Sequence, residues 1–307
     1  MISREIPLNP TLSPEGRGGD VSRPMNSADL NESAVNHGYV IRRVDRYRHG
    51  EHEQTSDAIT EEVPVAMLYN DVPFAVMMVT PLDLEDFALG FSLSEGLVAK
   101  PEELQSIELR PRLEGIELAM RVSSGTVEQR AGDGGERLLP GRSGCGLCGA
   151  RMLEDAVRHP AAVGDGPRVQ AAALEHALEK LQAMQPLNSA TGSVHAAAWV
   201  DRAGAIVLVR EDVGRHNALD KLIGAMVKVR IDPEQGFLLV TSRASYEMVT
   251  KAASAGITLM AAISAPTALA IHLAESTRMT LVGFARPGSY VIYTHPQRLL
   301  HAAGATA

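Results

Sequence analysis

The sequence predicts an α/β protein (α+β overall), in which a small N-terminal α+β domain precedes a three-layer α/β/α domain. Two observations lead to this fold class. In the second half of the chain, apolar runs alternate with segments of helical period, the pattern of a sheet covered by helices on both faces. In the first half, strand-like runs surround one helical segment. A chain of 307 residues, 45% of them hydrophobic, is long enough for two full-sized cores.

Changes in composition divide the chain into four segments. Residues 1–38 are rich in proline, serine, asparagine and glycine and show little periodicity, which predicts a disordered tail. We expect the small α+β domain over 39–140 and a cysteine-containing loop with a Gly/Pro connector over 141–168. The α/β domain is then expected over 169–300.

The elements of the first domain follow from its periodicity. Thr80-Pro81 is a helix start signal, and leucine, phenylalanine and alanine recur at helical spacing after it, so we expect a helix over 81–93. Asn70-Asp71 lies between two apolar runs and predicts a hairpin turn. The expected strands cover 39–44, 63–69, 72–76, 105–123 and 126–130.

The second domain begins with an amphipathic helix, expected over 170–184, and then alternates between strands and helices. The expected strands cover 196–200, 206–209, 237–241, 257–263, 280–284 and 290–293. The expected helices cover 217–229, 245–254 and 267–275.

Both cysteines of the chain lie two residues apart, at Cys145 and Cys148, in the glycine-rich run GRSGCGLCG. Such a pair can form a disulfide, supply half of a metal site, or carry a thiol of lowered pKa. A closed zinc site needs two more ligands, and no second cysteine pair exists. A thioredoxin-like role needs a helix after the first cysteine, which the glycines disfavour. We therefore expect a nucleophilic thiol on a loop, with Arg142 available to favour the thiolate.

Polar residues gather where strands of the second domain end, and ligands of open α/β sheets bind at such edges. Their cations and hydroxyls suit a nucleotide or a large phosphorylated cofactor. The competing interpretation is ordinary structure: helix capping by Asn217 and Ser245, a hydrogen-bonded core histidine at His195, and a plain hairpin loop. The candidates are Arg215, His216, Ser242, Arg243, Phe284, Arg286 and Ser289.

Net charge and apolar patterning limit the possible partners. A formal net charge of −8 argues against nonspecific nucleic-acid binding, which needs a basic surface. The N-terminal residues contain no apolar signal core, and two cysteines in so long a chain fit a reducing compartment. Residues 252–274 are long and apolar enough to suggest a membrane span, but Ser264-Ala265-Pro266-Thr267 predicts a strand end and a helix start inside it. We expect a cytoplasmic protein with no membrane or nucleic-acid partner.

Several blocks of the chain resemble the formate dehydrogenase accessory sulfurtransferases (the FdhD family), in order and over roughly residues 60–298. The most specific blocks are GRSGCGLCG, TGSVHAA, REDVGRHNALDK, TSRASYEMVTKA, ISAPTALAI and GFARPGSYVIYTHPQR. The tail over 1–38 lies outside the resemblance.

The resemblance implies sulfur transfer from a cysteine desulfurase to the bis-molybdopterin guanine dinucleotide form of the molybdenum cofactor, as required for formate dehydrogenase activity. It implies a persulfide on Cys145, with Cys148 as the assisting or alternative thiol. It places the guanine-binding stretch on Phe284, Ala285, Arg286, Pro287, Gly288 and Ser289. It also implies a cytidine-deaminase-like second domain without zinc, a homodimer, and a guanine nucleotide that could stand in for the cofactor.

Two functions of other classes stay open on the sequence. A noncatalytic chaperone would bind and deliver the cofactor without using its cysteines. A thiol–disulfide oxidoreductase would cycle a Cys145–Cys148 disulfide and need no nucleotide.

Overall fold

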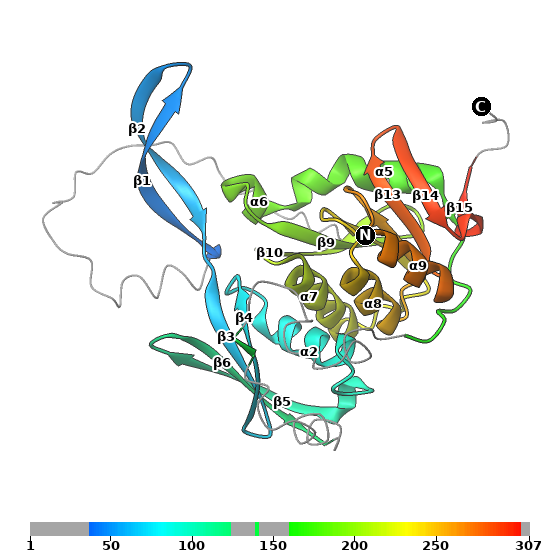
Figure 1. Ribbon diagram of the computed structural model, residues 1–307, viewed down its shortest axis with the longest axis horizontal. Helices are drawn as coiled ribbons and strands as arrows, with labels where there is room; N and C mark the ends of the chain where they lie inside the picture. Colours follow the sequence, from blue (N-terminus) through cyan, green and yellow to red (C-terminus); the bar gives the residue numbers. More distant parts are fainter. Residues whose placement is uncertain (1–36, 124–138, 141–159, 302–307) are drawn as a thin grey trace, which may run out of the picture.

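The structure, a computed structural model, describes residues 37–123, 139–140 and 160–301 (Figure 1). It contains a five-stranded sheet from the first half of the chain and a six-stranded sheet from the second half, each with its own apolar core. This arrangement confirms the expected α+β fold class. The expected tail and the cysteine run lie outside the described residues, as does the strand expected over 126–130.

The five-stranded sheet has the strand order β5-β6-β3-β4-β7. One helix, α2 (Leu84–Ser94), covers a face of this sheet and buries Phe87 and Phe91 against alternate residues of β3, including Met67 and Tyr69. The strands are β3 (Val63–Tyr69), β4 (Val72–Val79), β5 (Leu104–Arg112), β6 (Gly115–Val122) and β7 (Leu139–Pro140). The predicted turn at Asn70-Asp71 joins β3 and β4 with both φ angles positive, at 49° and 65°, as in the tightest hairpins.

A two-stranded hairpin stands away from both sheets (Figure 1). Its strands are β1 (Tyr39–Arg48) and β2 (Glu51–Thr60), and they pair with each other over all ten residues. At its base, the hydroxyl groups of Thr60 and Ser193 are 2.5 Å apart. The sequence predicts only the first part of β1 and no strand over 51–60, because β2 lacks the apolar alternation of a half-buried strand.

The six-stranded sheet has the strand order β10-β9-β11-β12-β13-β14. Strands β11, β12 and β13 run parallel, whereas β9, β10 and β14 pair antiparallel to their neighbours. The strands are β9 (His195–Asp201), β10 (Ile206–Asp212), β11 (Gly236–Val240), β12 (Leu259–Ala262), β13 (Thr280–Arg286) and β14 (Ser289–Thr294). A short pair, β8 (Val169–Gln170) with β15 (Leu299–Leu300), lies outside this sheet.

Helices cover both faces of the six-stranded sheet, so this unit has the three layers that the sequence predicts. Trp199, Leu238 and Met260 pack against the helices of one face. The residues before and after them on the same strands point to the other face and pack against α5. The helices of the first face are α7 (Arg215–Lys228), α8 (Tyr246–Ser254) and α9 (Ala268–Ser276). The second face carries α5 (Ala171–Leu181), which is followed by α6 (Pro186–Thr191).

The two sheets are joined by a close crossing of α2 and α7. A Cβ atom on Gly90 would lie 1.7 Å from the carbonyl oxygen of Asp220, and one on Gly224 would lie 2.0 Å from that of Asp86. Only glycine permits backbones to approach this closely. Beside the crossing, Lys251 Nζ lies 2.8 Å from a carboxylate oxygen of Asp220, which also accepts a hydrogen bond from Ser94.

The apolar stretch over 252–274 forms the end of α8, strand β12 and most of α9, as the helix start signal inside it predicts. In the described ranges, no helix has the length and apolar character needed to cross a membrane.

Candidate functional site

Most candidate residues meet at one edge of the six-stranded sheet. The carboxyl ends of β10, β11, β12 and β13 lie at this edge, because β9 pairs antiparallel to both β10 and β11 and starts there with His195. The structure therefore confirms the prediction that these polar residues lie at one edge of the sheet. They are Arg215, His216, Ser242, Arg243 and the turn over 284–289. Strands β9 and β13 are three positions apart in the sheet, which corresponds to roughly 14 Å.

One half of the edge, which we call the β10–α7 half, comprises His195 and residues 211–217. Asp212 is fully buried at its centre and lies 2.7 Å from Nζ of Lys221, which is also fully buried. The same carboxylate accepts hydrogen bonds from the backbone N–H of Thr80 (3.0 Å) and Gly214 (2.8 Å). Lys221 Nζ also donates to the carbonyl oxygen of Thr80 at 2.9 Å. Much of the polar REDVGRHNALDK block thus ties the two sheets together.

Asn217 does not cap a helix, contrary to the sequence-based interpretation. Helix α7 begins two residues earlier at Arg215, with Gly214 as its N-cap. The Asn217 amide donates instead to the carbonyl oxygen of Met78 at 2.8 Å and to Asp212 at 2.9 Å. The residue therefore joins β4 to the first turn of α7, and no local sequence pattern reports such a distant partner.

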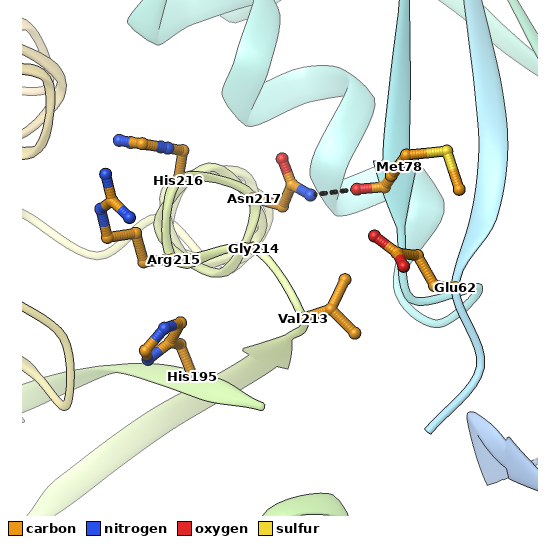
Figure 2. A pocket seen from close by; sticks show the side chains of 8 residues that line it. All are labelled: Glu62, Met78, His195, Val213, Gly214, Arg215, His216 and Asn217. Atoms are coloured by element: carbon orange, nitrogen blue, oxygen red, sulfur yellow. Dashed lines mark hydrogen bonds between the residues drawn. The ribbon is translucent and has the colours of Figure 1, made fainter. Parts of the chain in front are cut away.

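A cavity of about 140 Å³ opens between β4 and the first turn of α7. Figure 2 shows His195, Arg215 and His216 on one side of it, with Met78 and Glu62 on the other. His216 is buried, and its Nε2 lies 2.9 Å from a carboxylate oxygen of Glu247. Nε of Arg215 is buried without a hydrogen-bond partner among the residues that the structure describes. One side of the cavity therefore offers a guanidinium group and two imidazoles, which suits an anionic group of a ligand, while Glu62 places a carboxylate on the other side.

The pKa of His195 is lowered, first by burial of the ring and then by the positive charges of Arg215 and His216. Its imidazole is thus held in the neutral form, which carries one donor and one acceptor nitrogen. A neutral ring beside the Arg215 guanidinium can accept a proton or orient a ligand without adding a further charge.

Ser242 and Arg243 follow β11, next to β9 in the sheet. Ser242 is buried, and its hydroxyl donates to the carbonyl oxygen of Arg243 at 3.1 Å, so it serves the local backbone. The Arg243 side chain is exposed and lies in no ion pair within the described ranges. Ser245 precedes α8 as its N-cap residue, yet its side chain makes no capping hydrogen bond, contrary to the expected capping role.

The other half of the edge, the β13–β14 half, is the turn over 284–289. Arg286 pairs with Ser289 across Pro287 and Gly288, and the φ of Gly288 is +79°, as a type II turn requires. Phe284 has a φ of +52° and remains 44% exposed, so its ring presents an apolar surface to solvent. Arg286 is exposed as well, whereas Ala285 is buried in the core beneath the turn.

Glu175 of α5 contacts this turn and was not singled out by sequence reasoning. One of its carboxylate oxygens accepts a hydrogen bond from the backbone N–H of Gly288 at 2.6 Å. Burial and the nearby Glu175 carboxylate raise the pKa of Tyr290, the next residue along β14. Glu175 lies 113 residues before Gly288. A glutamate on the polar side of an amphipathic helix is common, so the sequence does not indicate this contact.

Cys145 and Cys148, the predicted sulfur-carrying residues, lie outside the described residues. Among the histidines, aspartates and glutamates that the structure does describe, no three come together as metal ligands would.

Comparison with known proteins gives consistent matches. The model of the FdhD/NarQ family matches residues 60–300. The chain is 54% identical over 269 residues to the sulfur carrier protein FdhD of Xanthomonas euvesicatoria, covering 87% of this chain and 94% of the relative. It is 50% identical over 260 residues to that of Cupriavidus necator, covering 85% and 90%.

The fold is similar to a solved structure from Desulfotalea psychrophila, assigned as a formate dehydrogenase accessory protein. The TM-score is 0.65 at 24% sequence identity, and the match covers 85% of this chain and 99% of that one. At this identity the likeness supports the fold.

Proposed function

Because the chain belongs to the FdhD/NarQ family, we propose that it is a sulfur carrier for the maturation of formate dehydrogenase. Relatives named sulfur carrier protein FdhD share about half of its residues over most of its length. The sequence supplies a thiol pair in a glycine-rich run, at Cys145 and Cys148. The family membership and this thiol pair together favour a carrier that holds sulfur covalently.

The structural observation that carries the proposal is the chemistry of the sheet edge. The exposed guanidinium groups of Arg243 and Arg286, together with the exposed ring of Phe284, lie at the ends of β11 and β13, which are separated in the sheet by β12 alone. Guanidinium groups bind phosphates through charge-assisted, often bidentate hydrogen bonds, and an aromatic ring can stack on a nucleobase. We assign this edge to the nucleotide part of the bis-molybdopterin guanine dinucleotide cofactor, as the substrate that receives sulfur.

The length of the edge suits a long ligand. The turn over 284–289 and the cavity beside His195 are roughly 14 Å apart along the strand ends. In the proposed arrangement the guanine lies at the β13–β14 half and the remainder of the cofactor extends toward Arg215. Glu175 places a carboxylate against Gly288, so phosphates would avoid the tip of the turn and lie nearer to Arg286 and Arg243.

The first chemical step is a persulfide transfer. The Cys145 thiolate attacks the terminal sulfur of the desulfurase persulfide, forming a new S–S bond on Cys145 while the bond on the desulfurase breaks. The desulfurase cysteine leaves as a thiolate, so no external oxidant or reductant is needed. Arg142, which shortly precedes Cys145 in the sequence, would favour the thiolate form of the attacking cysteine. A homodimer and a cytoplasmic location remain predictions of the sequence.

The test is mass spectrometry of the purified protein after incubation with a cysteine desulfurase and cysteine. The wild-type protein is expected to gain about 32 Da per transferred sulfur atom, lost on treatment with a thiol reductant. Cys145→Ala is expected to abolish the gain, and Cys148→Ala is the matched control that reveals which thiol leads.

Other outcomes discriminate between the classes of function. A Cys145→Ala/Cys148→Ala protein that still supports formate dehydrogenase activity in cells would favour a chaperone that uses no thiol. A stable Cys145–Cys148 disulfide with reductase activity in the absence of nucleotide would favour an oxidoreductase.

A further inference from the structure

The cavity between β4 and the first turn of α7 has two walls of opposite character. Arg215 and His195 lie on one side, with a cationic guanidinium group and a neutral imidazole. Glu62 lines the other side, and Figure 2 shows its carboxylate directed toward α7. In the part of the chain that the structure describes, neither Glu62 nor Arg215 makes an ion pair. Both charged groups are therefore available to a ligand.

These two walls disfavour a purely anionic occupant. Phosphate or sulfate would be attracted by Arg215, but the Glu62 carboxylate would repel it across the same cavity. A ligand that satisfies both walls presents a hydrogen-bond acceptor to Arg215 and donors to Glu62. Val213 lines the cavity as well and projects toward Glu62 in Figure 2, so it offers an apolar contact to a ring.

The size of the cavity limits its occupant to one part of a long ligand. Its volume is about 140 Å³, whereas sites for drug-sized molecules have about 300–1,000 Å³. Its walls are held in place, because the Asn217 amide donates to the carbonyl oxygen of Met78 at 2.8 Å and so joins β4 to α7. A preformed cavity of this size suits a single ring system.

The substrate assigned above contains two kinds of ring with the required donors. Guanine and pterin share a 2-amino-4-oxopyrimidine ring, in which a ring N–H and the amino group lie side by side, next to a carbonyl oxygen. An ionised carboxylate only accepts hydrogen bonds, so one glutamate can accept from both donors at once. The adjoining carbonyl oxygen is an acceptor for a guanidinium group, as guanine O6 is when arginine reads DNA.

We propose that this cavity binds a pterin of the bis-molybdopterin guanine dinucleotide, with Glu62 on its amino edge and Arg215 on its carbonyl oxygen. The proposal rests on the function proposed above, in which the guanine stacks on Phe284. That turn is roughly 14 Å from the cavity along the strand ends, so the stacked guanine leaves the cavity to a pterin. Glu62 is then a specificity-determining residue, because its carboxylate accepts an amino group and rejects an oxygen at the same ring position.

The first experiment compares pterin with lumazine, in which an oxygen atom replaces the 2-amino group. Both ligands are fluorescent, so a low, fixed concentration of each can be titrated with the full chain. We expect saturable binding of pterin with a Kd of about 1 mM or tighter, as for other ligands of this size. Lumazine is expected to bind on the order of tenfold more weakly, because its oxygen faces the Glu62 carboxylate where a donor is needed.

The second experiment reverses this preference with Glu62→Gln. The glutamine amide has nearly the shape of the carboxylate but offers one acceptor and one donor group. It matches the ring N–H and the oxygen of lumazine, whereas its amino group opposes the amino group of pterin. We expect pterin to bind on the order of tenfold more weakly than to the wild type, and lumazine to bind more tightly. The control is Glu102→Gln, at an exposed glutamate of η1 (Pro101–Glu103), which should leave both affinities unchanged.

The exchange of preference separates a contact with the ligand from a loss of structure. A misfolded variant loses both ligands, whereas a residue that touches the ring exchanges one ligand for the other. Glu62 is exposed, so the circular dichroism spectrum of Glu62→Gln should match that of the wild type. Its affinity for GDP should also be unchanged, because the guanine is assigned to Phe284.

Three results would overturn the inference. They are the absence of saturable pterin binding to the wild type, equal affinities for pterin and lumazine, and a loss of GDP affinity in Glu62→Gln. The last would place guanine in the cavity instead of pterin. The proposed function has separate tests, in the persulfide on Cys145 and in GDP binding at Phe284. Failure of those tests with intact discrimination between pterin and lumazine would retain the pterin site and remove the function proposed around it.

Discussion

The two halves of the sheet edge carry similar polar residues and use them differently. In the β10–α7 half, Asp212 and Lys221 are fully buried and hold strand β4 and the Thr80 backbone against the second sheet. In the β13–β14 half, Phe284 and Arg286 face solvent. A charged residue at a strand end therefore does not by itself indicate a ligand. Burial and the identity of its partners decide whether it serves the fold or a binding site.

The largest expected effect is on stability, at the buried ion pair. Lys221→Met leaves the Asp212 carboxylate buried without its cation, so the free energy of unfolding should fall by about 3–5 kcal/mol. Urea denaturation measures this. Lys228→Met is the matched control on the same helix, because Lys228 is 39% exposed beside Asp86 and should cost no more than about 1 kcal/mol. Equal losses of unfolding free energy in both variants would contradict the structural role of the Asp212–Lys221 pair in the β10–α7 half.

A smaller loss of stability is expected where α2 and α7 cross. Gly224→Ala would place a Cβ atom 2.0 Å from the carbonyl oxygen of Asp86, so the helices must move apart. We expect destabilisation of about 1–3 kcal/mol, measured by urea denaturation. The exposed Glu85 of the facing helix provides the control, Glu85→Ala, which should change stability by about 0.5 kcal/mol or less. A Gly224→Ala protein of wild-type stability would show that the crossing is looser than described.

The smallest expected effect is a pH dependence of stability at His195, in the β10–α7 half. The lowered pKa of His195 means that the unfolded chain binds a proton more readily below pH 6.5, the ordinary value for histidine. The free energy of unfolding should therefore fall as the pH drops from 6.5 toward the folded-state pKa. His195→Gln should flatten this part of the profile, measured by urea denaturation between pH 5 and pH 8. An unchanged slope would show that the ring is not held neutral.

The sequence predicts the elements whose burial is regular. Helix α2 is recognised by apolar residues at helical spacing. Strands β11 to β13 are buried on both faces, so they are recognised as short continuous apolar runs. Strand β2 was missed because both faces of its hairpin are exposed, which removes the apolar alternation that marks a strand.

The gathering of the candidate residues at one edge of the sheet was predictable from the sequence, whereas their contacts were not. The polar strand ends were visible in the sequence, and parallel strands bring such ends to one edge. The contact between Glu175 and Gly288 joins residues far apart in the chain, as does the link from Asn217 to Met78. These depend on the packing of α5 and β4, which no local pattern specifies.

The most direct test of the account is a calorimetric titration of the purified protein with GDP. We predict saturable binding that Phe284→Ala and Arg286→Ala each weaken by about tenfold, because one loses stacking on the base and the other a charge-assisted phosphate contact. Val207→Ala, at another exposed apolar residue of the same sheet, should bind as the wild type does. GDP affinity that is unchanged in Phe284→Ala and Arg286→Ala would contradict the assignment of the nucleotide to the β13–β14 half.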